Sequence, residues 1–188
     1  MRLLRVCELG LACGTAGLLL VSSYHPFPPT PVEQTGKVLS RSVRREPAPA
    51  VRQRLDEAAQ RHGLPPHLVE AVAYWESGWD PSKVSETGAV GLMQIQPEVA
   101  AELAPRLVGH PVDIQQPGDN ADLGAAILRA YINDQGGDVD RGLAAYYQGP
   151  RSIADDGMFP DTVQYVDGID GLRQLLDSNQ PLPPPDQP

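Results

Sequence analysis

The chain has 188 residues, enough for one folded domain with extended segments at its ends. It carries 24 acidic and 15 basic residues, a formal net charge of −9, and no basic run interleaved with aromatic residues, which argues against a nucleic-acid partner. Both cysteines, Cys7 and Cys13, lie in the first 23 residues, so the rest of the chain has no thiol for a disulfide or for thiol catalysis.

Residues 1–23 form a segment unlike the rest. Arg2 and Arg5 precede a mostly apolar run over residues 6–21, and small residues follow it before Tyr24. This pattern is typical of a secretory signal peptide. An uncleaved N-terminal membrane anchor is a second interpretation, weakened by Glu8 and by a run slightly short for a membrane span. We therefore expect an exported protein, extracellular, in the cell wall or in the periplasm, with a membrane tether as the alternative.

Two proline-rich segments flank the expected domain. Residues 24–50 are poor in large apolar side chains and are predicted to be a disordered linker. Residues 177–188 carry five prolines and are predicted to be a disordered tail. The folded domain is therefore expected over residues 51–176.

Helical signals dominate the domain. Apolar spacing and breaker residues predict helices near residues 51–62, 66–77, 97–103, 120–135, 139–148 and 160–176. The stretch from Asp80 to Gly91 has the composition of a loop, and a small hairpin around residues 89–95 is the most β-structure expected. Gly124 inside a predicted helix indicates close packing, because a glycine there otherwise costs about 1 kcal/mol against alanine. The predicted fold class is mainly α.

Glu76 is the candidate catalytic residue. It lies in the last turn of the helix over residues 66–77, which Gly78 ends at once. The negative end of the helix dipole and the aromatic neighbours Tyr74 and Trp75 both favour the protonated carboxyl and raise its pKa. A glutamate that stays protonated near neutral pH can act as a general acid. The alternative is a glutamate that reaches solvent or caps a loop.

Four patches in this order and spacing carry a family resemblance: Glu76-Ser77, Ser85 with Gly91-Leu92-Met93-Gln94, Ala145-Tyr146-Tyr147-Gln148-Gly149-Pro150, and Tyr165-Val166. Together they resemble the soluble, lysozyme-like (SLT-type) lytic transglycosylases over residues 51–176. The resemblance implies a goose-type-lysozyme-like helical domain with a groove for peptidoglycan glycan strands. It implies cleavage of the β-1,4 bond between N-acetylmuramic acid and N-acetylglucosamine, with Glu76 as acid and then base while the sugar's 6-hydroxyl closes a 1,6-anhydro ring. It also implies no metal and no cofactor, and we expect a monomer.

The same resemblance assigns further site residues. By position, Ser77 holds the carboxyl or nearby backbone. Ser85, Met93 and Gln94 match family residues that line the sugar site. Tyr146 and Tyr165 match family positions whose hydroxyls lie close to the acid. Each has a purely structural alternative: Met93 as core filler, the tyrosines as packed aromatics, and Ser85 as a turn residue.

The third patch departs from the family pattern, which usually places asparagine where this chain has Tyr147. This leaves local hydrogen bonding and subsite preference open. Two rival functions also stay open. A hydrolytic muramidase of inverting type would need a second carboxylate, such as Asp80 or Glu86, roughly 6.5–9.5 Å from Glu76. A non-catalytic wall-binding protein would keep the groove without turnover. Scattered histidines argue against a metal enzyme.

Overall fold

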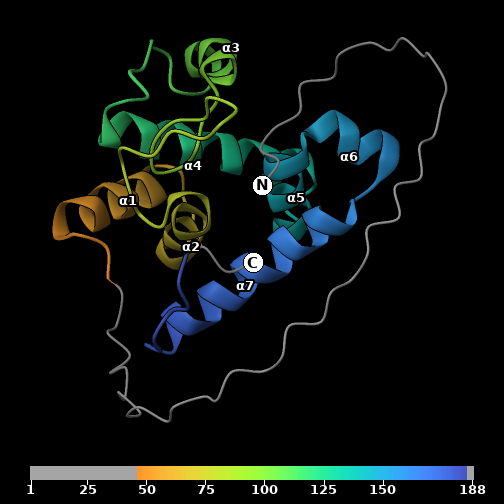
Figure 1. Ribbon diagram of the computed structural model, residues 1–188. Coiled ribbons are helices and arrows are strands. Elements are labelled where there is room, and N and C mark those ends of the chain that lie inside the picture. Colours follow the sequence, from red (N-terminus) through yellow and green to blue (C-terminus); the bar gives the residue numbers. More distant parts are fainter. Residues whose placement is uncertain (1–45, 186–188) are drawn as a thin grey trace, which may run out of the picture. The chain divides into compact units, whose positions relative to one another are not determined.

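The computed structural model describes residues 46–185, and the predictions for residues 1–45 lie outside the described residues. Seven helices run through the described range (Figure 1): α1 Pro49–Arg61, α2 Pro66–Ser77, α3 Pro97–Leu107, α4 Pro117–Asp134, α5 Val139–Gln148, α6 Pro150–Asp156 and α7 Pro160–Asp177. Its β-structure amounts to two isolated bridges, between Val84 and Val90 and between Val90 and Ile95. The mainly α prediction is confirmed, and no helix of residues 46–185 has the length and hydropathy of a membrane span.

The sequence itself explains where the helices begin. Every helix except α5 has a proline in its first turn. Proline suits this position because its φ is already fixed near the helical value and because the first turn does not need its missing N–H. The start of α5 is capped instead by Asp138, whose carboxylate accepts a 3.1 Å hydrogen bond from the Arg141 N–H. These rules place α4 from Pro117, slightly before the predicted start, and α1 from Pro49.

Helix α6 lies between the predicted helices over residues 139–148 and 160–176, where the sequence predicted no helix. Pro150 starts it, and Ile153 is its buried residue, so one apolar side chain provides too weak a periodic signal to predict a helix from the sequence. Within the structure, Ile153 packs into the hydrophobic core and anchors this short helix.

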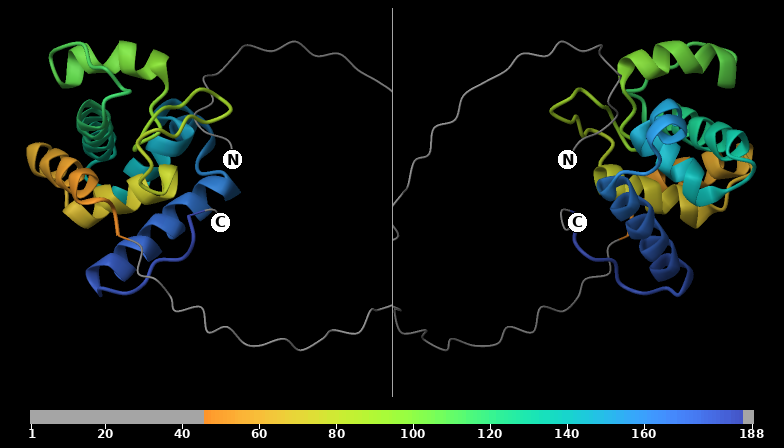
Figure 2. Two further views of the ribbon diagram at one scale, coloured as in Figure 1. Left: turned by 60° about the vertical axis from the view of Figure 1, so that its left-hand side comes forward. Right: turned by 90° about the vertical axis from the view of Figure 1, so that its right-hand side faces the viewer.

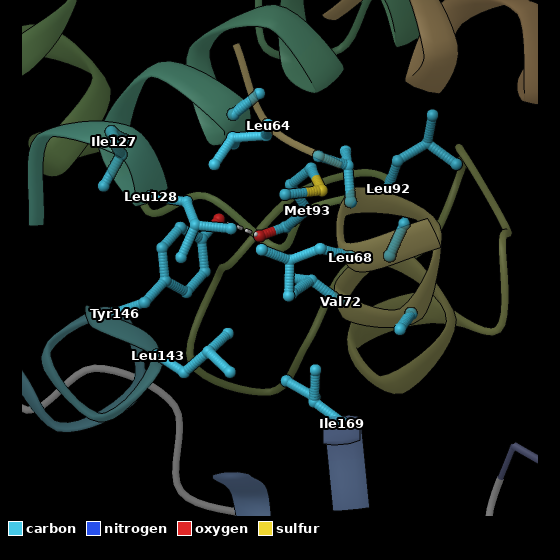
Figure 3. Packing of buried hydrophobic residues seen from close by; sticks show 14 of the residues in the cluster. Leu64, Leu68, Val72, Leu92, Met93, Ile127, Leu128, Leu143, Tyr146 and Ile169 are labelled. Carbon is cyan, nitrogen blue, oxygen red and sulfur yellow. Dashed lines mark hydrogen bonds between the residues drawn. The ribbon is translucent and has the colours of Figure 1, made fainter. Parts of the chain in front are cut away.

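The core places α2 at the centre of the domain. Helix α2 packs against α1 and α7, while α4 packs against α1 and α5. Figure 2 shows α3 against α4, at the margin of the domain away from α7. Leu68 and Val72 of α2 meet Leu128 of α4, Leu143 of α5 and Ile169 of α7 in one cluster (Figure 3). Burying each such side chain contributes about 1.5–3 kcal/mol.

Gly124 fulfils its predicted packing role. A Cβ atom at this position of α4 would lie 2.5 Å from the Cβ of Met93, closer than real side chains approach. The missing side chain therefore lets α4 contact the turn formed by residues 91–94.

The segment after α7 differs from the expected disordered tail as far as Pro185. Leu182 is buried in the hydrophobic core, and the Tyr74 hydroxyl donates a hydrogen bond to the carbonyl of Pro183. Pro185 lies so close to Gly78 that a Cβ there would come within 2.9 Å of it. The low apolar content that suggested disorder is offset by one well-placed leucine, and prolines lose little backbone entropy when they are fixed.

Candidate active site

Glu76 lies at the C-terminal end of α2 with 3% of its surface exposed. The helix ends there because Gly78 adopts the left-handed conformation, with φ +66° and ψ +26°, and donates its N–H to the carbonyl of Tyr74 at 2.8 Å. The chain therefore turns away directly after the carboxyl-bearing residue and leaves its side chain inside the domain.

Tyr165 of α7 holds the carboxyl. Its hydroxyl donates a 2.9 Å hydrogen bond to Oε1 of Glu76. Trp75 packs edge-on to the Tyr165 ring, with centroids 5.9 Å apart, and Tyr147 stacks on that ring at 4.5 Å and 24°. These three aromatic rings fix the hydroxyl that contacts the acid.

The electrostatics of the site favour a protonated Glu76. Burial raises the pKa of its carboxyl to about 8, although the Tyr165 hydrogen bond and the positive charge of Lys83 both act to lower it. Burial also raises the pKa values of Tyr146 and Tyr165 well above their usual range, so both hydroxyls keep their protons. The raised pKa favours the protonated Glu76 carboxyl at pH 7.

Ser77 and Tyr146 both bind the turn formed by residues 91–94. The Ser77 hydroxyl contacts the carbonyls of Ala73 and Leu92, each at 2.9 Å, so it holds nearby backbone and makes no hydrogen bond to the carboxyl. The Tyr146 hydroxyl donates to the carbonyl of Met93 at 2.8 Å (Figure 3). These contacts connect the end of α2, the turn and the end of α5.

Gln94 is fully buried and has a positive φ of +46°. Its Nε2 donates to the carbonyls of Lys83 and Gly91, at 3.1 and 3.0 Å. Its Oε1 accepts no hydrogen bond from any residue of the described range 46–185. A buried amide oxygen without a partner is costly, so the two hydrogen bonds of Nε2 are what holds this side chain in the turn.

Met93 and Ser85 take structural positions. The Met93 side chain is buried in the core against Gly124. The Ser85 hydroxyl accepts the Ala89 N–H at 2.9 Å and fixes the loop between α2 and α3. Their roles in sugar binding stay predictions.

Asn120 was not predicted as a site residue, although it organises the turn. This buried α4 side chain accepts the Met93 N–H at 2.8 Å and donates to the carbonyls of Val90 and Ile114, at 2.8 and 2.9 Å. No local sequence signal marks it, because its partners are up to 30 residues away.

Tyr147 and Gln148, the unusual part of the third patch, make different contacts. The Gln148 amide donates to Ser152 and to the Gly157 carbonyl, and its oxygen accepts from Phe159 and Thr162. Gln148 thus connects α5, α6 and α7, while Tyr147 keeps part of its ring exposed beside Tyr165.

Two histidines of the described range are paired with aspartates. His62 contacts Asp122 at 2.8 Å, and His67 contacts Asp177 at 2.6 Å. No group of three or more potential metal ligands occurs within residues 46–185.

Known proteins resemble this chain in sequence. The family model described as the Transglycosylase SLT domain matches residues 53–158. The "Endo-type membrane-bound lytic murein transglycosylase A" of Klebsiella pneumoniae subsp. pneumoniae is 28% identical over 130 residues, which are 66% of this chain and 58% of that protein. The "Transglycosylase" of Enterobacteria phage PRD1 is 39% identical over 92 residues, 49% of this chain and 32% of that protein. The chain thus spans little more than half of the first relative and about a third of the second.

Solved structures show the same fold. The lytic transglycosylase Slt of Pseudomonas aeruginosa, solved as an inactive glutamate-to-glutamine mutant, superposes with a TM-score of 0.61 at 27% identity, over 70% of this chain and 25% of that one. The 70 kDa soluble lytic transglycosylase of Escherichia coli gives a TM-score of 0.60 at 21% identity, over 69% of this chain and 24% of that one. Because the family model covers more than half of the sequence, this chain belongs to the transglycosylase SLT domain family.

Proposed function

We propose that this protein is a peptidoglycan lytic transglycosylase that cleaves the β-1,4 bond between N-acetylmuramic acid and N-acetylglucosamine and forms a 1,6-anhydro product. The observation that carries the proposal is the environment of Glu76, a buried carboxyl with a pKa of about 8 held by the Tyr165 hydroxyl. Relatives named as lytic murein transglycosylases support the substrate class.

Glu76 would serve both steps of the reaction. Protonated at neutral pH, it donates its proton to the glycosidic oxygen as the bond to the anomeric carbon breaks, with the muramic N-acetyl group assisting at that carbon. The carboxylate then takes the proton of the sugar's 6-hydroxyl while that oxygen bonds to the anomeric carbon. The proton passes from the 6-hydroxyl to the new 4-hydroxyl through one residue, and no water is consumed.

Contacts around Glu76 favour this route over inverting hydrolysis. Within residues 46–185, the groups that shift its pKa besides burial are Tyr165 and Lys83, and neither is a carboxylate. The Asp80 carboxylate instead accepts hydrogen bonds from the Ser82 hydroxyl and N–H, at 2.6 and 2.8 Å. Glu86 is exposed. Neither candidate for the second carboxylate is directed at the acid by any of these contacts.

The proposal includes the remaining site and the location. Ser77 and Tyr146 shape the turn formed by residues 91–94, Gln94 holds that turn through the carbonyls of Lys83 and Gly91, and Tyr165 positions the carboxyl. Ser85 and Met93 contribute to the proposed sugar site indirectly: Ser85 stabilises the loop between α2 and α3, and Met93 stabilises the turn that packs on Gly124. A relative named as membrane-bound supports a location in the cell envelope. We propose that residues 1–23 direct export of the protein and that it acts as a monomer.

Mass spectrometry of the muropeptides that the full chain releases from purified peptidoglycan tests the function. We expect products one water lighter than hydrolytic muropeptides, and none from Glu76→Gln, which is nearly isosteric. Reducing-end muramic acid would instead make the protein a hydrolase. Sugar binding without any product would assign it a binding role.

A further inference from the structure

Lys83 lies in the loop between α2 and α3, and no motif of the sequence marks it. We propose that Lys83 is a positioning residue for Glu76. The Lys83 ammonium group, at the end of α2, stabilises the carboxylate that forms when Glu76 gives up its proton. This inference rests on the proposed function and adds to it a residue that sets the pH range of activity.

The geometry places the charge at the end of the helix that carries the acid. Lys83 Nζ donates a 2.9 Å hydrogen bond to the main-chain carbonyl of Glu76 itself. That carbonyl belongs to the last turn of α2, where carbonyls lack partners within the helix and the dipole is negative. A cation there offsets the dipole at the point where the negative carboxylate must form.

The turn beside the acid holds Lys83 in place. Its main-chain carbonyl accepts the Gly91 N–H at 2.8 Å and the Gln94 Nε2 at 3.1 Å. Lys83 is half-buried, so water and salt screen its charge less than that of a surface lysine. A fixed backbone and a bonded ammonium keep the charge at a constant position.

The other titratable groups that act near Glu76 are phenols. Tyr165 of α7 donates a hydrogen bond to the Glu76 carboxyl. The negative charge of an ionised Glu76 raises the pKa values of Tyr146 and Tyr147 of α5. Burial raises the pKa values of all three, so they remain neutral near pH 7. Among the groups of residues 46–185 that influence Glu76, Lys83 is therefore the one with a full charge, and it opposes the effect of burial.

The experiment compares the pH dependence of kcat/KM for the full chain with Lys83→Gln and Lys83→Arg. Glutamine keeps a hydrogen-bond donor without the charge, and arginine keeps the charge. In Lys83→Gln we expect the alkaline limb, where Glu76 loses its proton, to move up by about one pH unit. We expect its kcat at pH 7 to fall about tenfold while KM changes little. Lys83→Arg should retain the wild-type limb.

Arg106→Gln is the matched control, because it removes the same charge from the exposed face of α3. Its profile should not move. If Lys83→Gln and Lys83→Arg lose activity equally with the limb unmoved, Lys83 serves the backbone alone and the proposal is overturned.

A substrate-free titration separates this inference from the function. The Glu76 carboxyl can be followed by carbon NMR in glutamate-labelled full chain and assigned with Glu76→Gln. Its midpoint should rise in Lys83→Gln and stay in Lys83→Arg, and an unmoved midpoint overturns the role of Lys83. A wild-type chain that titrates as expected but releases no muropeptide overturns the proposed function instead.

Discussion

The hydroxyl of Tyr165 donates a 2.9 Å hydrogen bond to Oε1 of Glu76, although 89 positions separate the two residues in the chain. One partner ends α2 and the other lies in α7, so the packing of these two helices aligns the candidate acid. Any change that separates the helices also removes the donor from the carboxyl.

Tyr165→Phe tests this contact directly. The ring stack with Tyr147 remains, but the carboxyl loses a hydrogen bond that lowers its pKa. We therefore expect the alkaline limb of the pH profile to move up and kcat at pH 7 to fall about tenfold. Tyr74→Phe, which removes the hydroxyl that contacts Pro183, is the matched control and should leave the limb in place. An unchanged profile in Tyr165→Phe contradicts the assigned role.

Glu76→Gln should make the fold more stable at alkaline pH. The folded-state pKa of about 8 lies above the ordinary glutamate value of 4.5, so between these values the folded protein holds a proton that the unfolded chain releases. The stability tied to this proton is complete below pH 4.5 and is lost as the pH rises toward 8. At about 1.4 kcal/mol per pKa unit, Glu76→Gln should exceed the wild type by on the order of 4 kcal/mol near pH 8.

Urea denaturation of the wild type and Glu76→Gln at acid and alkaline pH measures this difference. The exposed Glu86 provides the control, because Glu86→Gln removes the same charge without burial. A difference between the wild type and Glu76→Gln that does not grow with pH would show that the buried carboxyl is not protonated in the fold.

The ring of Tyr147 should matter more than its hydroxyl. Tyr147→Phe keeps the stack on Tyr165 and should retain kcat within about threefold, whereas Tyr147→Ala removes stacking of about 0.5–1.5 kcal/mol and should lower kcat about tenfold. Tyr147→Asn, the residue usual in the family, tests the departure itself. Equal activity of the Phe and Ala variants would show that the stack does not align Tyr165.

Asn120→Ala should destabilise the turn formed by residues 91–94. The variant leaves the Met93 N–H and the Ile114 carbonyl without the partner that Asn120 provides, whereas the Val90 carbonyl keeps the Ile95 N–H at 3.0 Å. Each buried polar group left unpaired costs about 1–3 kcal/mol, so a total loss of about 4 kcal/mol is expected in thermal or urea unfolding. Asn133→Ala, on the exposed part of the same helix, is the control and should be nearly neutral. A small loss in Asn120→Ala would mean that water replaces the side chain.

Truncation after Asn179 tests the segment beyond α7. It removes the buried Leu182 and the Pro183 carbonyl that Tyr74 contacts. We expect the free energy of unfolding to fall by about 2–3 kcal/mol. Deleting residues 186–188 alone should leave it unchanged. Equal stability of the two truncated chains would show that the segment does not support the domain.

Local rules predict much of this site. Glu76 in an apolar last turn and Gly78 after it are adjacent in the sequence, so the burial and the helix end can both be inferred. The proline starts of most helices follow from one residue each. Gly124 signals close packing, although the sequence does not identify Met93 as its neighbour.

Contacts between distant segments could not be predicted in this way. Asn120 and Lys83 stand in stretches that read as ordinary helix and loop, and their roles depend on which backbone groups the fold brings to them. Leu182 is one apolar residue among prolines, a composition that favours disorder until α2 and α7 provide a surface for it. In each case the information lies in tertiary packing, which periodicity does not report.

The contact between Gly124 and Met93 has an evolutionary consequence. With 2.5 Å between the Met93 Cβ and the site of any new Cβ on Gly124, the two positions share one volume. Relatives with a larger residue at the glycine position should carry a smaller one at the methionine position, and the two should covary even if neither touches the substrate. Such covariation would distinguish a methionine kept for its volume from one kept for the sugar.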